Sequence, residues 1–352
     1  MPIVAHLDLD AFYAAVEELE SPSLRTQPLV VGGDPHGRGV VATANYVARS
    51  FGIHSAMSSA EALRRCPKVV FVRPRHALYR EYSAAVWKSI REVVPVVERT
   101  GLDEGYLDFT LLAADFVRAR ALAEAVRTSV RAATSLSCSL GVAPTKVVAK
   151  VASDRRKPGG ITVVPAGTEA AFLAPFAVRR LPGVGPRAEE RLRSAGIATI
   201  GELGALTDLE LRAVLPGQVG RLLRDRALGI DPRGLDLTSE RISISVEETF
   251  ERDLRERDLL HAELRRMADQ LGSHLRRDGL SARTVTTKLR YADFSIRSRS
   301  TSLTVGIDDA ERIAELACSL LDRGLTDRPG ALRLVGVGVS GLSDYRQLSF
   351  EE

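Results

Sequence analysis

The sequence predicts an α+β protein in which two mixed units flank a wholly helical segment. Three observations point to this fold class. Between residues 3 and 164, short segments with alternating apolar residues are interleaved with longer segments of helical periodicity. Residues 169–228 carry helical periodicity only, in several short stretches. After residues 231–241, a polar and turn-prone stretch that we expect to be a linker, strand and helix patterns return.

The first unit is expected to begin with a strand at 3–10, because apolar residues alternate there with His6, Asp8 and Asp10. These three polar side chains therefore share one face of the strand. A helix is expected next, at 11–20. The remaining elements are expected to be a strand at 29–33, a strand-to-helix unit at 40–52, a helix at 79–94, a hairpin at 96–110 with its turn at 103–105, a helix at 113–134, a strand at 136–142, a helix at 144–157 and a strand at 161–164.

The second unit repeats the mixture of strands and helices. Its elements are expected to be strands at 242–250, 285–291, 303–307 and 331–342, with helices at 258–278 and 309–324.

Composition places the chain among ordinary globular proteins. The 352 residues are 45% hydrophobic and 27% charged, which excludes disordered and fibrous classes. No run approaches the roughly 18 uninterrupted apolar residues of a membrane span, and the first residues do not form a secretory signal, so we expect a cytoplasmic protein. The three cysteines are far apart, which argues against disulfides and zinc. The net charge of +4 (49 minus 45) suggests a polyanionic partner.

Three carboxylates are candidates for a metal site. Asp8 lies at the end of the first expected strand, and Asp103 and Glu104 lie at the expected hairpin turn. A turn at Gly105 allows neighbouring acids to converge, whereas in an extended strand they point to opposite faces. Carboxylate oxygens suit Mg²⁺, and two such ions about 3.5–4 Å apart support in-line phosphoryl displacement. The alternative is a solvated strand end and an ordinary turn.

Basic and hydroxyl side chains near these acids suggest a phosphate ligand. On the helix expected at 144–157, one stripe carries three of the six lysines of the chain. In the strand-to-helix unit expected at 40–52, a second set of polar residues recurs at a spacing of three positions. The alternative for each set is a solvated helix face. The first set is Lys146, Lys150, Asp154 and Lys157; the second is Thr43, Tyr46 and Arg49.

Two further segments suit a nucleic-acid backbone. Gly183 and Gly185 lie in a tight connection before an expected helix, where exposed backbone N–H groups can bind phosphate; a generic turn between helices is the alternative. Residues 276–299 hold seven basic and two acidic residues, and their strand pattern places Lys288 and Arg290 on a basic sheet face. Arg297 and Arg299 belong to the same basic stretch.

The sequence resembles the Y-family DNA polymerases of the DinB, or DNA polymerase IV, type. The similarity extends over nearly the whole chain, including the glycine-rich connection at 181–192, residues 245–250 and residues 334–342. Four motifs carry it in order: Asp8-Leu-Asp-Ala-Phe-Tyr13, Thr43-Ala-Asn-Tyr46-Val-Ala-Arg49, Leu-Asp103-Glu104-Gly-Tyr-Leu-Asp and Lys150-Val-Ala-Ser-Asp154-Arg-Arg-Lys157.

The resemblance implies a right-hand architecture with a helix-hairpin-helix in its thumb. The implied domains are a palm at 1–10 and 76–165, fingers at 11–75, a helical thumb at 166–230, a linker at 231–241 and a little finger at 242–352.

The resemblance also implies roles for individual residues. Asp8, Asp103 and Glu104, with the Leu9 carbonyl, are the expected ligands of two Mg²⁺ ions, for which Mn²⁺ can substitute. Tyr13 matches the steric gate that excludes ribonucleotides. The expected contacts of the incoming nucleotide are Phe12, Tyr13, Thr43, Tyr46, Arg49 and Lys157, and those of DNA are Gly183, Gly185, Lys288, Arg290, Arg297 and Arg299.

The expected function is template-directed, translesion-type DNA synthesis from dNTPs on primer-template DNA, by a monomer. One alternative is a catalytically inactive DNA-binding relative, and another is a different palm-type enzyme such as a nucleotide cyclase. Residues 347–352 form a degenerate version of a clamp-binding peptide, so a sliding clamp is a further candidate partner.

Overall fold

The chain divides into two units, Met1–Leu237 and the residues from Thr238 onward. The computed structural model describes residues 1–238 and 241–344. Within these ranges, no helix is long and apolar enough to cross a membrane. The mixed α+β class expected from the sequence is confirmed in both units.

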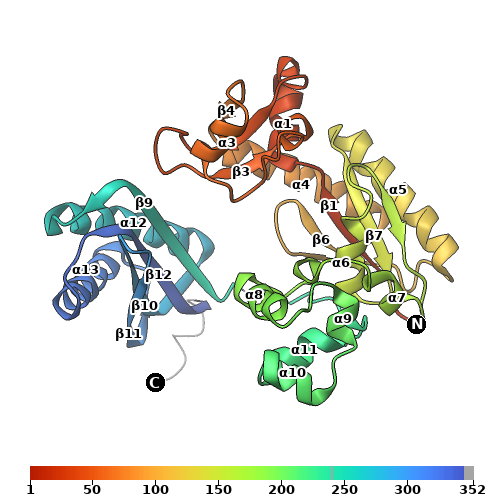
Figure 1. Ribbon diagram of the computed structural model, residues 1–352. Coiled ribbons are helices and arrows are strands. Elements are labelled where there is room, and N and C mark those ends of the chain that lie inside the picture. The colour runs from red at the N-terminus through yellow and green to blue at the C-terminus, as the bar shows by residue number, and fades with distance from the viewer. Residues whose placement is uncertain (239–240, 345–352) are drawn as a thin grey trace. The chain divides into compact units, whose positions relative to one another are not determined.

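A five-stranded sheet forms the centre of the first unit (Figure 1). Its middle strand, β1, is antiparallel to both neighbours, and only the last pair, β7 and β8, is parallel. In spatial order the strands are β5 (Val97–Arg99), β6 (Glu104–Asp108), β1 (Val4–Leu9), β7 (Cys138–Ala143) and β8 (Ile161–Val163). The expected first strand and the hairpin are therefore confirmed, but the turn predicted at 103–105 is wrong: it lies at 100–103, and Glu104 and Gly105 belong to β6.

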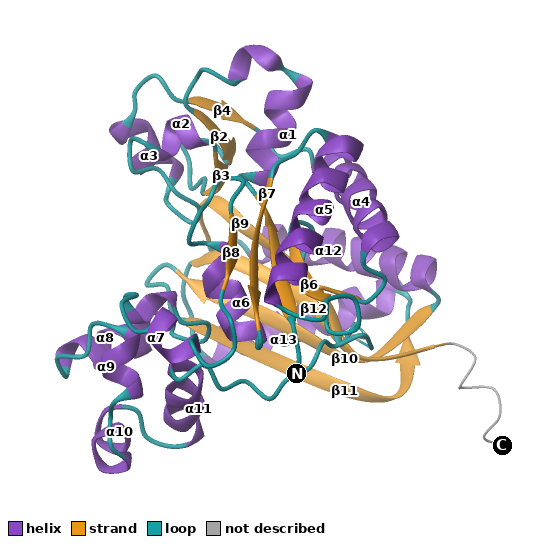
Figure 2. Ribbon diagram, turned by 90° about the vertical axis from the view of Figure 1, so that its right-hand side faces the viewer, coloured by secondary structure: helices purple, strands orange, loops and turns teal. Residues whose placement is uncertain are grey.

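Helices cover both faces of this sheet. On one face α4 (His76–Val93) and α5 (Phe116–Thr134) pack against apolar residues of β1, including the fully buried Leu7. On the other face α6 (Lys146–Ser153) lies across β1 and β7 (Figure 2). Alternation along β1 thus separates the hydrophobic core from a polar face, as the sequence pattern predicts.

Gly141 of β7 brings α6 unusually close to the sheet. A Cβ atom at this position would lie 2.1 Å from the Ala149 carbonyl oxygen and 2.3 Å from the Ser153 nitrogen. Any side chain would push the helix away, so the close approach depends on glycine. Because Gly141 pairs with His6 across β1 and β7, the C-terminal part of α6 lies directly over the polar face of β1.

A small layered subdomain follows β1 in the chain. Its three-stranded sheet has the order β3-β2-β4, and Asn45 anchors it by accepting the N–H groups of Leu29 and Ala48 while donating to Glu18. The sequence did not lead us to expect α3 and β4. The elements are α1 (Phe12–Glu20), a 3-10 turn η1 (Pro22–Leu24), β2 (Leu29–Gly32), β3 (Val41–Ala44), α2 (Tyr46–Arg49), α3 (Ser59–Arg65) and β4 (Val70–Val72).

The helical segment consists of short helices, as expected. Two of them begin with capping boxes, in which Thr199 and Thr207 exchange hydrogen bonds with the glutamates three residues later. The elements are α7 (Glu169–Leu173), η2 (Val178–Arg180), α8 (Pro186–Ser194), α9 (Ile200–Gly204), α10 (Asp208–Val214) and α11 (Gln218–Ala227).

The segment predicted to be a linker contains the boundary between the two units, but its first part is anchored. The buried Asp231 carboxylate accepts two hydrogen bonds from the Arg233 guanidinium, at 2.7 and 2.8 Å. The Asp236 N–H donates to a Glu98 carboxylate oxygen at 2.7 Å. Residues 231–237 therefore belong to the first unit.

The second unit is a four-stranded antiparallel sheet with two helices on one face. Its strands are longer than expected, because serine and threonine on the open face weaken the hydrophobic alternation. The elements are β9 (Ser243–Leu254), α12 (Arg257–Asp278), β10 (Leu280–Tyr291), β11 (Ile296–Ile307), α13 (Ala310–Asp327) and β12 (Leu332–Asp344), with the strands in the order β11-β10-β12-β9.

Candidate active site

Three acidic residues meet at one end of the central sheet. Asp8 and Glu104 are direct cross-strand partners in β1 and β6. Asp103 precedes β6, and its carbonyl oxygen accepts the Leu9 N–H at 2.9 Å. The hairpin expected from the sequence therefore brings Asp103 and Glu104 to the end of β1. Residues about 95 positions apart in the chain become neighbours through strand pairing.

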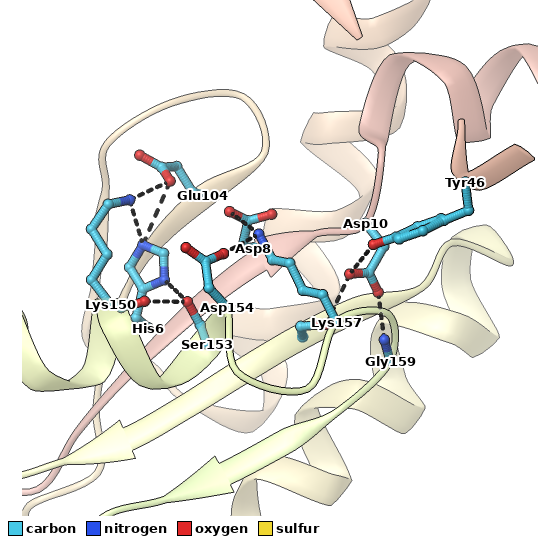
Figure 3. A network of polar contacts seen from close by, with 11 residues as sticks. His6, Asp8, Asp10, Tyr46, Glu104, Lys150, Ser153, Asp154, Lys157 and Gly159 are labelled. Carbon is cyan, nitrogen blue, oxygen red and sulfur yellow. Dashed lines mark hydrogen bonds and ion pairs between the residues drawn. The ribbon is translucent and has the colours of Figure 1, made fainter. Parts of the chain in front are cut away.

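Two lysine ammonium groups contact these carboxylates (Figure 3). Lys157 Nζ lies 2.8 Å from Asp8 Oδ2 and 2.8 Å from Asp154 Oδ1. Lys150 Nζ lies 2.6 Å from Glu104 Oε2. The site thus alternates negative and positive groups, and each is only partly exposed.

Burial changes the proton affinity of the site. It raises the pKa of Asp8 to about 6, although the Lys157 ammonium acts in the opposite direction. Burial also raises the pKa of Asp103, and the neighbouring Glu104 carboxylate adds to this. The pKa of Lys157 is raised: burial alone would lower it, but the attraction of Asp8 and Asp154 outweighs that effect.

The donor chemistry fits a hard divalent cation. Within the described ranges, no group of three His, Cys, Asp or Glu side chains is arranged to hold a metal ion. Asp8, Asp103, Glu104 and the Leu9 carbonyl nevertheless offer oxygen donors only, which is the preference of Mg²⁺. The crowding of acids also contributes to the raised pKa of Asp8, and a bound cation would relieve it.

Asp10 organises the neighbouring part of the site, a role that sequence reasoning did not assign. Its buried carboxylate accepts the hydroxyls of Ser137 at 2.7 Å and Ser139 at 2.8 Å, and the Gly159 N–H at 2.8 Å. A fourth donor, the Tyr46 hydroxyl, lies 3.4 Å away. Asp10 therefore links β1, β7, the turn after Lys157 and the subdomain that carries Tyr46. The only sequence feature that pointed to a role for Asp10 is the alternation at 3–10, which places it on the same face as His6 and Asp8.

The expected triphosphate contacts are only partly on one helix. Tyr46 and Arg49 belong to α2, and the Arg49 guanidinium lies over the Tyr46 ring, 5.1 Å from its centre. Thr43 lies instead on β3, so the expectation that all three share a helix face is wrong. The short α2 begins at Tyr46 because Asn45 caps it.

The two aromatic residues after β1 have different environments. Tyr13 is half-buried and stacks on Tyr79, with ring centres 4.2 Å apart and an interplanar angle of 14°. The Tyr79 hydroxyl donates to Glu17, which holds that ring in place. Phe12 is 2% exposed, so its ring belongs to the core, and its contact with a nucleotide stays a prediction.

Lys146 does not belong to the polar site, which corrects the predicted lysine stripe. Its ammonium is buried, forms an ion pair with both Glu98 carboxylate oxygens and lies 4.6 Å from the centre of the Tyr106 ring. Helix α6 also ends at Ser153, so Lys157 lies in the following turn. The stripe was predicted from an uninterrupted helix at 144–157, which the structure does not have.

His6 is a second residue to which no role was assigned from the sequence. It is 1% exposed and its Nδ1 lies 2.9 Å from Ser153 Oγ, while its Nε2 lies 3.4 Å from Lys150 Nζ. Burial, together with the charges of Lys150 and Lys157, lowers the pKa of His6 well below its ordinary value. The imidazole is therefore neutral near neutral pH.

The glycine-rich connection before α8 has the expected tight geometry. Gly183 adopts a φ of +100°, and a Cβ there would lie 2.6 Å from an Arg226 guanidinium nitrogen. Gly185 is the N-cap of α8. The positive φ thus favours glycine at position 183, whereas position 185 has a φ of −86° and open space around a Cβ and would accept a side chain. The contact of both residues with DNA stays a prediction.

The four basic residues of the second unit that are predicted to contact DNA lie on two faces of its sheet. Residues directly opposite in antiparallel strands project to the same side. Arg297 is opposite Leu289, and Arg299 is opposite the buried Thr287, so both arginines are on the side that the helices cover. Arg299 forms an ion pair with Asp327 of α13.

Lys288 and Arg290 project from the open face of the second sheet. Lys288 reaches across Gly336, its cross-strand partner, to both carboxylate oxygens of Glu247, at 2.9 and 2.8 Å. The Arg290 guanidinium lies over the Phe294 ring. Of the four predicted DNA contacts in this unit, the open face therefore carries only Lys288 and Arg290, and the charge of Lys288 is paired with Glu247. The candidate clamp-binding peptide at 347–352 lies outside the described residues.

Comparisons with known proteins identify the family of the chain. Residues 7–154 match the impB/mucB/samB family, residues 241–350 its C-terminal domain, and residues 167–197 the IMS family HHH motif. DNA polymerase IV of Streptomyces coelicolor is 44% identical over 349 residues, covering 98% of this chain and 72% of that protein. DNA polymerase IV of Methanoculleus marisnigri is 40% identical, covering 99% and 98%.

The fold has a counterpart among solved structures. The Y-family DNA polymerase chimera Dbh-Dpo4(243-245)-Dbh matches with a TM-score of 0.88 and 24% identity, covering 97% of this chain and 99% of that one. Together with the relatives above, this shows that the chain belongs to the Y-family DNA polymerases, in the DNA polymerase IV (DinB) group.

Proposed function

We propose that the chain extends a primer by template-directed nucleotidyl transfer, including synthesis past damaged template bases. The primer 3′-hydroxyl attacks the α-phosphate of a dNTP, a new P–O bond forms, and pyrophosphate leaves. The observation that carries the proposal is the pairing of Asp8 with Glu104 beside Asp103, with the ammonium of Lys157 against Asp8 and that of Lys150 against Glu104. Charges of both signs are thus available where a polyphosphate reacts.

In this proposal Asp8, Asp103 and Glu104, with the Leu9 carbonyl, hold two Mg²⁺ ions, or Mn²⁺ in their place. When bound, the ions supply Lewis acidity at the attacking and leaving oxygens. The protein contributes by fixing the ligands: Asp8 and Glu104 through strand pairing, and Asp103 through its carbonyl contact with Leu9.

The triphosphate is held by Thr43, Tyr46, Arg49 and Lys157. Asp10 supports this set, because it accepts from Gly159 in the turn after Lys157 and lies 3.4 Å from the Tyr46 hydroxyl. As the triphosphate binds, Lys157 exchanges its contact with Asp8 for a contact with phosphate. Tyr13, stacked on Tyr79, forms a rigid wall at the sugar.

The domain roles follow from the same proposal. The five-stranded sheet with its helices is the palm, the small subdomain after β1 the fingers, the helical segment the thumb and the second unit the little finger. The open face of the β9–β12 sheet and the turn at Gly183 contact the backbone of primer-template DNA. Sliding-clamp binding, monomeric state and cytoplasmic location stay predictions.

Primer extension tests the proposed catalytic site. We expect Mg²⁺-dependent extension by the unaltered protein, and a loss of at least roughly a hundredfold in Asp103→Ala or Glu104→Ala, the scale for removing key electrostatic groups. DNA binding by these variants should stay close to that of the unaltered protein. Glu81→Ala, an exposed change on α4, is the matched control. Unimpaired extension by Asp103→Ala would overturn the assignment, and no extension by the unaltered protein would favour an inactive DNA-binding relative.

A further inference from the structure

His6 is a buried polar residue that has no role in the proposed reaction, although it lies close in sequence to the candidate metal ligands. It lies on β1 two residues before Asp8 and is 1% exposed. Its cross-strand partners are Tyr106 on β6 and Gly141 on β7. The Tyr106 ring lies 4.8 Å away at 63°, and Gly141 lets α6 approach the imidazole from above the sheet. The ring therefore has a fixed position and orientation.

The hydrogen bonds around His6 determine its tautomer. The Ser153 hydroxyl has a single hydrogen, which it donates to the Lys150 carbonyl oxygen at 2.8 Å. With that hydrogen directed at the carbonyl oxygen, we assign the contact between Ser153 Oγ and His6 Nδ1, at 2.9 Å, as a donation from Nδ1–H to Oγ. A proton on Nε2 would instead face the Lys150 ammonium, with Glu104 Oε2 3.7 Å away, too far for a good hydrogen bond. A neutral imidazole with its proton on Nδ1 has a lone pair on Nε2. The serine on α6 thus makes Nε2 a hydrogen-bond acceptor.

That lone pair faces the ammonium of Lys150. Lys150 Nζ lies 3.4 Å from His6 Nε2 and 2.6 Å from Glu104 Oε2. The ammonium is consequently shared between the imidazole and one carboxylate oxygen, and the Lys150 side chain is 34% exposed. Without Nε2, the ammonium would lose the second of these two partners and would be free to span both Glu104 carboxylate oxygens or to turn toward water.

We propose that His6 is a positioning residue that acts through Lys150. By holding the ammonium on Glu104 Oε2, it fixes the Glu104 carboxylate beside Asp8 and leaves Oε1 available to a divalent cation. Ser153 contributes by selecting the tautomer. This inference rests on the proposed metal-binding role of Glu104. It gives a function to His6, which shares the polar face of β1 with Asp8.

Two amide variants separate the two ring nitrogens. In His6→Gln, the amide oxygen can reach the place of Nε2 and still accept from Lys150. In His6→Asn, the shorter amide can reach only the place of Nδ1, so Ser153 keeps its donor but Lys150 loses its acceptor. We expect His6→Asn to weaken Mn²⁺ binding about tenfold, the scale of one charge-assisted hydrogen bond, and His6→Gln to stay within about twofold.

The affinity is measured by titrating the protein with Mn²⁺ and monitoring the free ion by electron paramagnetic resonance. The full chain carries a primer-template with a dideoxy-terminated primer and the next dNTP, so that no reaction occurs. If His6 acts through Lys150, His6→Asn has no further effect in a Lys150→Met background. Lys88→Met, which changes an exposed lysine on α4, is the matched control and should keep Mn²⁺ affinity. Steady-state extension should show a lower kcat for His6→Asn with little change in KM for dNTP.

The tautomer is tested on the unaltered protein, independently of any variant that folds poorly. Nitrogen-15 spectra of the imidazole should show the proton on Nδ1. A proton on Nε2, an unchanged Mn²⁺ affinity in His6→Asn, or additive effects of His6→Asn and Lys150→Met would each overturn the inference. These results leave the proposed function intact as long as the unaltered protein extends primers; absence of metal-dependent extension there would instead remove the proposed function.

Discussion

Asp8 and Glu104 are direct partners across β1 and β6, yet their carboxylates contact different ammonium groups, Lys157 and Lys150. The two acids are thus held side by side without sharing a counterion. This separation keeps both carboxylates at the end of the sheet and gives each a cation of its own. The arrangement leads to predictions about protons, sugar selection, stability and DNA binding.

The apparent affinity for Mg²⁺ should fall below about pH 6. Burial raises the pKa of Asp8 to about 6 in the folded chain, so below that pH the carboxyl carries a proton that competes with a cation. Above it the group is ionised and available, and the effect disappears. The check is the Mg²⁺ concentration for half-maximal primer extension between pH 5.5 and 8. A value that does not change across pH 6 would contradict this role of Asp8.

The size of the ring at Tyr13 should control sugar selection. Tyr13→Ala removes the ring that stacks on Tyr79, so a ribose 2′-hydroxyl no longer meets a wall. We expect the preference for dNTP over rNTP to fall by roughly tenfold or more, which corresponds to about 1.4 kcal/mol in the transition state. Tyr13→Phe keeps the ring and should keep the preference. The measurement is kcat/KM for matched dNTP and rNTP; equal preference in all three proteins would exclude Tyr13 as the gate.

Lys146 should matter for stability and not for nucleotide binding. Its buried ion pair with Glu98 means that Lys146→Met leaves a carboxylate without its cation, at a cost of about 3–5 kcal/mol. The double change Lys146→Met and Glu98→Leu should recover much of this loss. Urea unfolding of the first unit can be followed through Trp87, the only tryptophan, which is fully buried. A cost below about 1 kcal/mol for Lys146→Met would show that the pair contributes little.

The salt dependence of DNA binding should distinguish the two faces of the second sheet. Arg290→Ala removes a cation from the open face and should reduce the slope of log K against log salt by about one unit. Arg299→Ala should leave the slope unchanged, because Arg299 is paired with Asp327 on the side of the helices. Fluorescence anisotropy with a primer-template at several salt concentrations measures both. A reduced slope in Arg299→Ala alone would reverse our assignment of the faces.

Much of the candidate site was predictable from the sequence because local pattern determines local structure. The alternation at 3–10 predicted a strand with His6, Asp8 and Asp10 on one face, and the expected hairpin at 96–110 placed Asp103 and Glu104 near its turn, although the turn lies at 100–103 and Glu104 begins β6. Motif similarity supplied the candidate roles of Tyr13, Tyr46 and Lys157. These features depend on periodicities of two or 3.6 residues, which a sequence displays directly.

Side-chain partners were not predictable, because they depend on which elements meet in space. Lys146 and Lys150 are one helical turn apart, yet one is buried against Glu98 and the other reaches Glu104. Arg290 and Arg299 belong to the same basic stretch, but strand register directs them to opposite faces of the sheet. The sequence by itself determined most of the elements, the acidic end of β1 and the family, although it did not predict α3, β4 or the end of α6 at Ser153. Only the tertiary structure decided which charge each lysine and arginine meets, since strand register and the close approach of α6 at Gly141 are set by packing between distant segments.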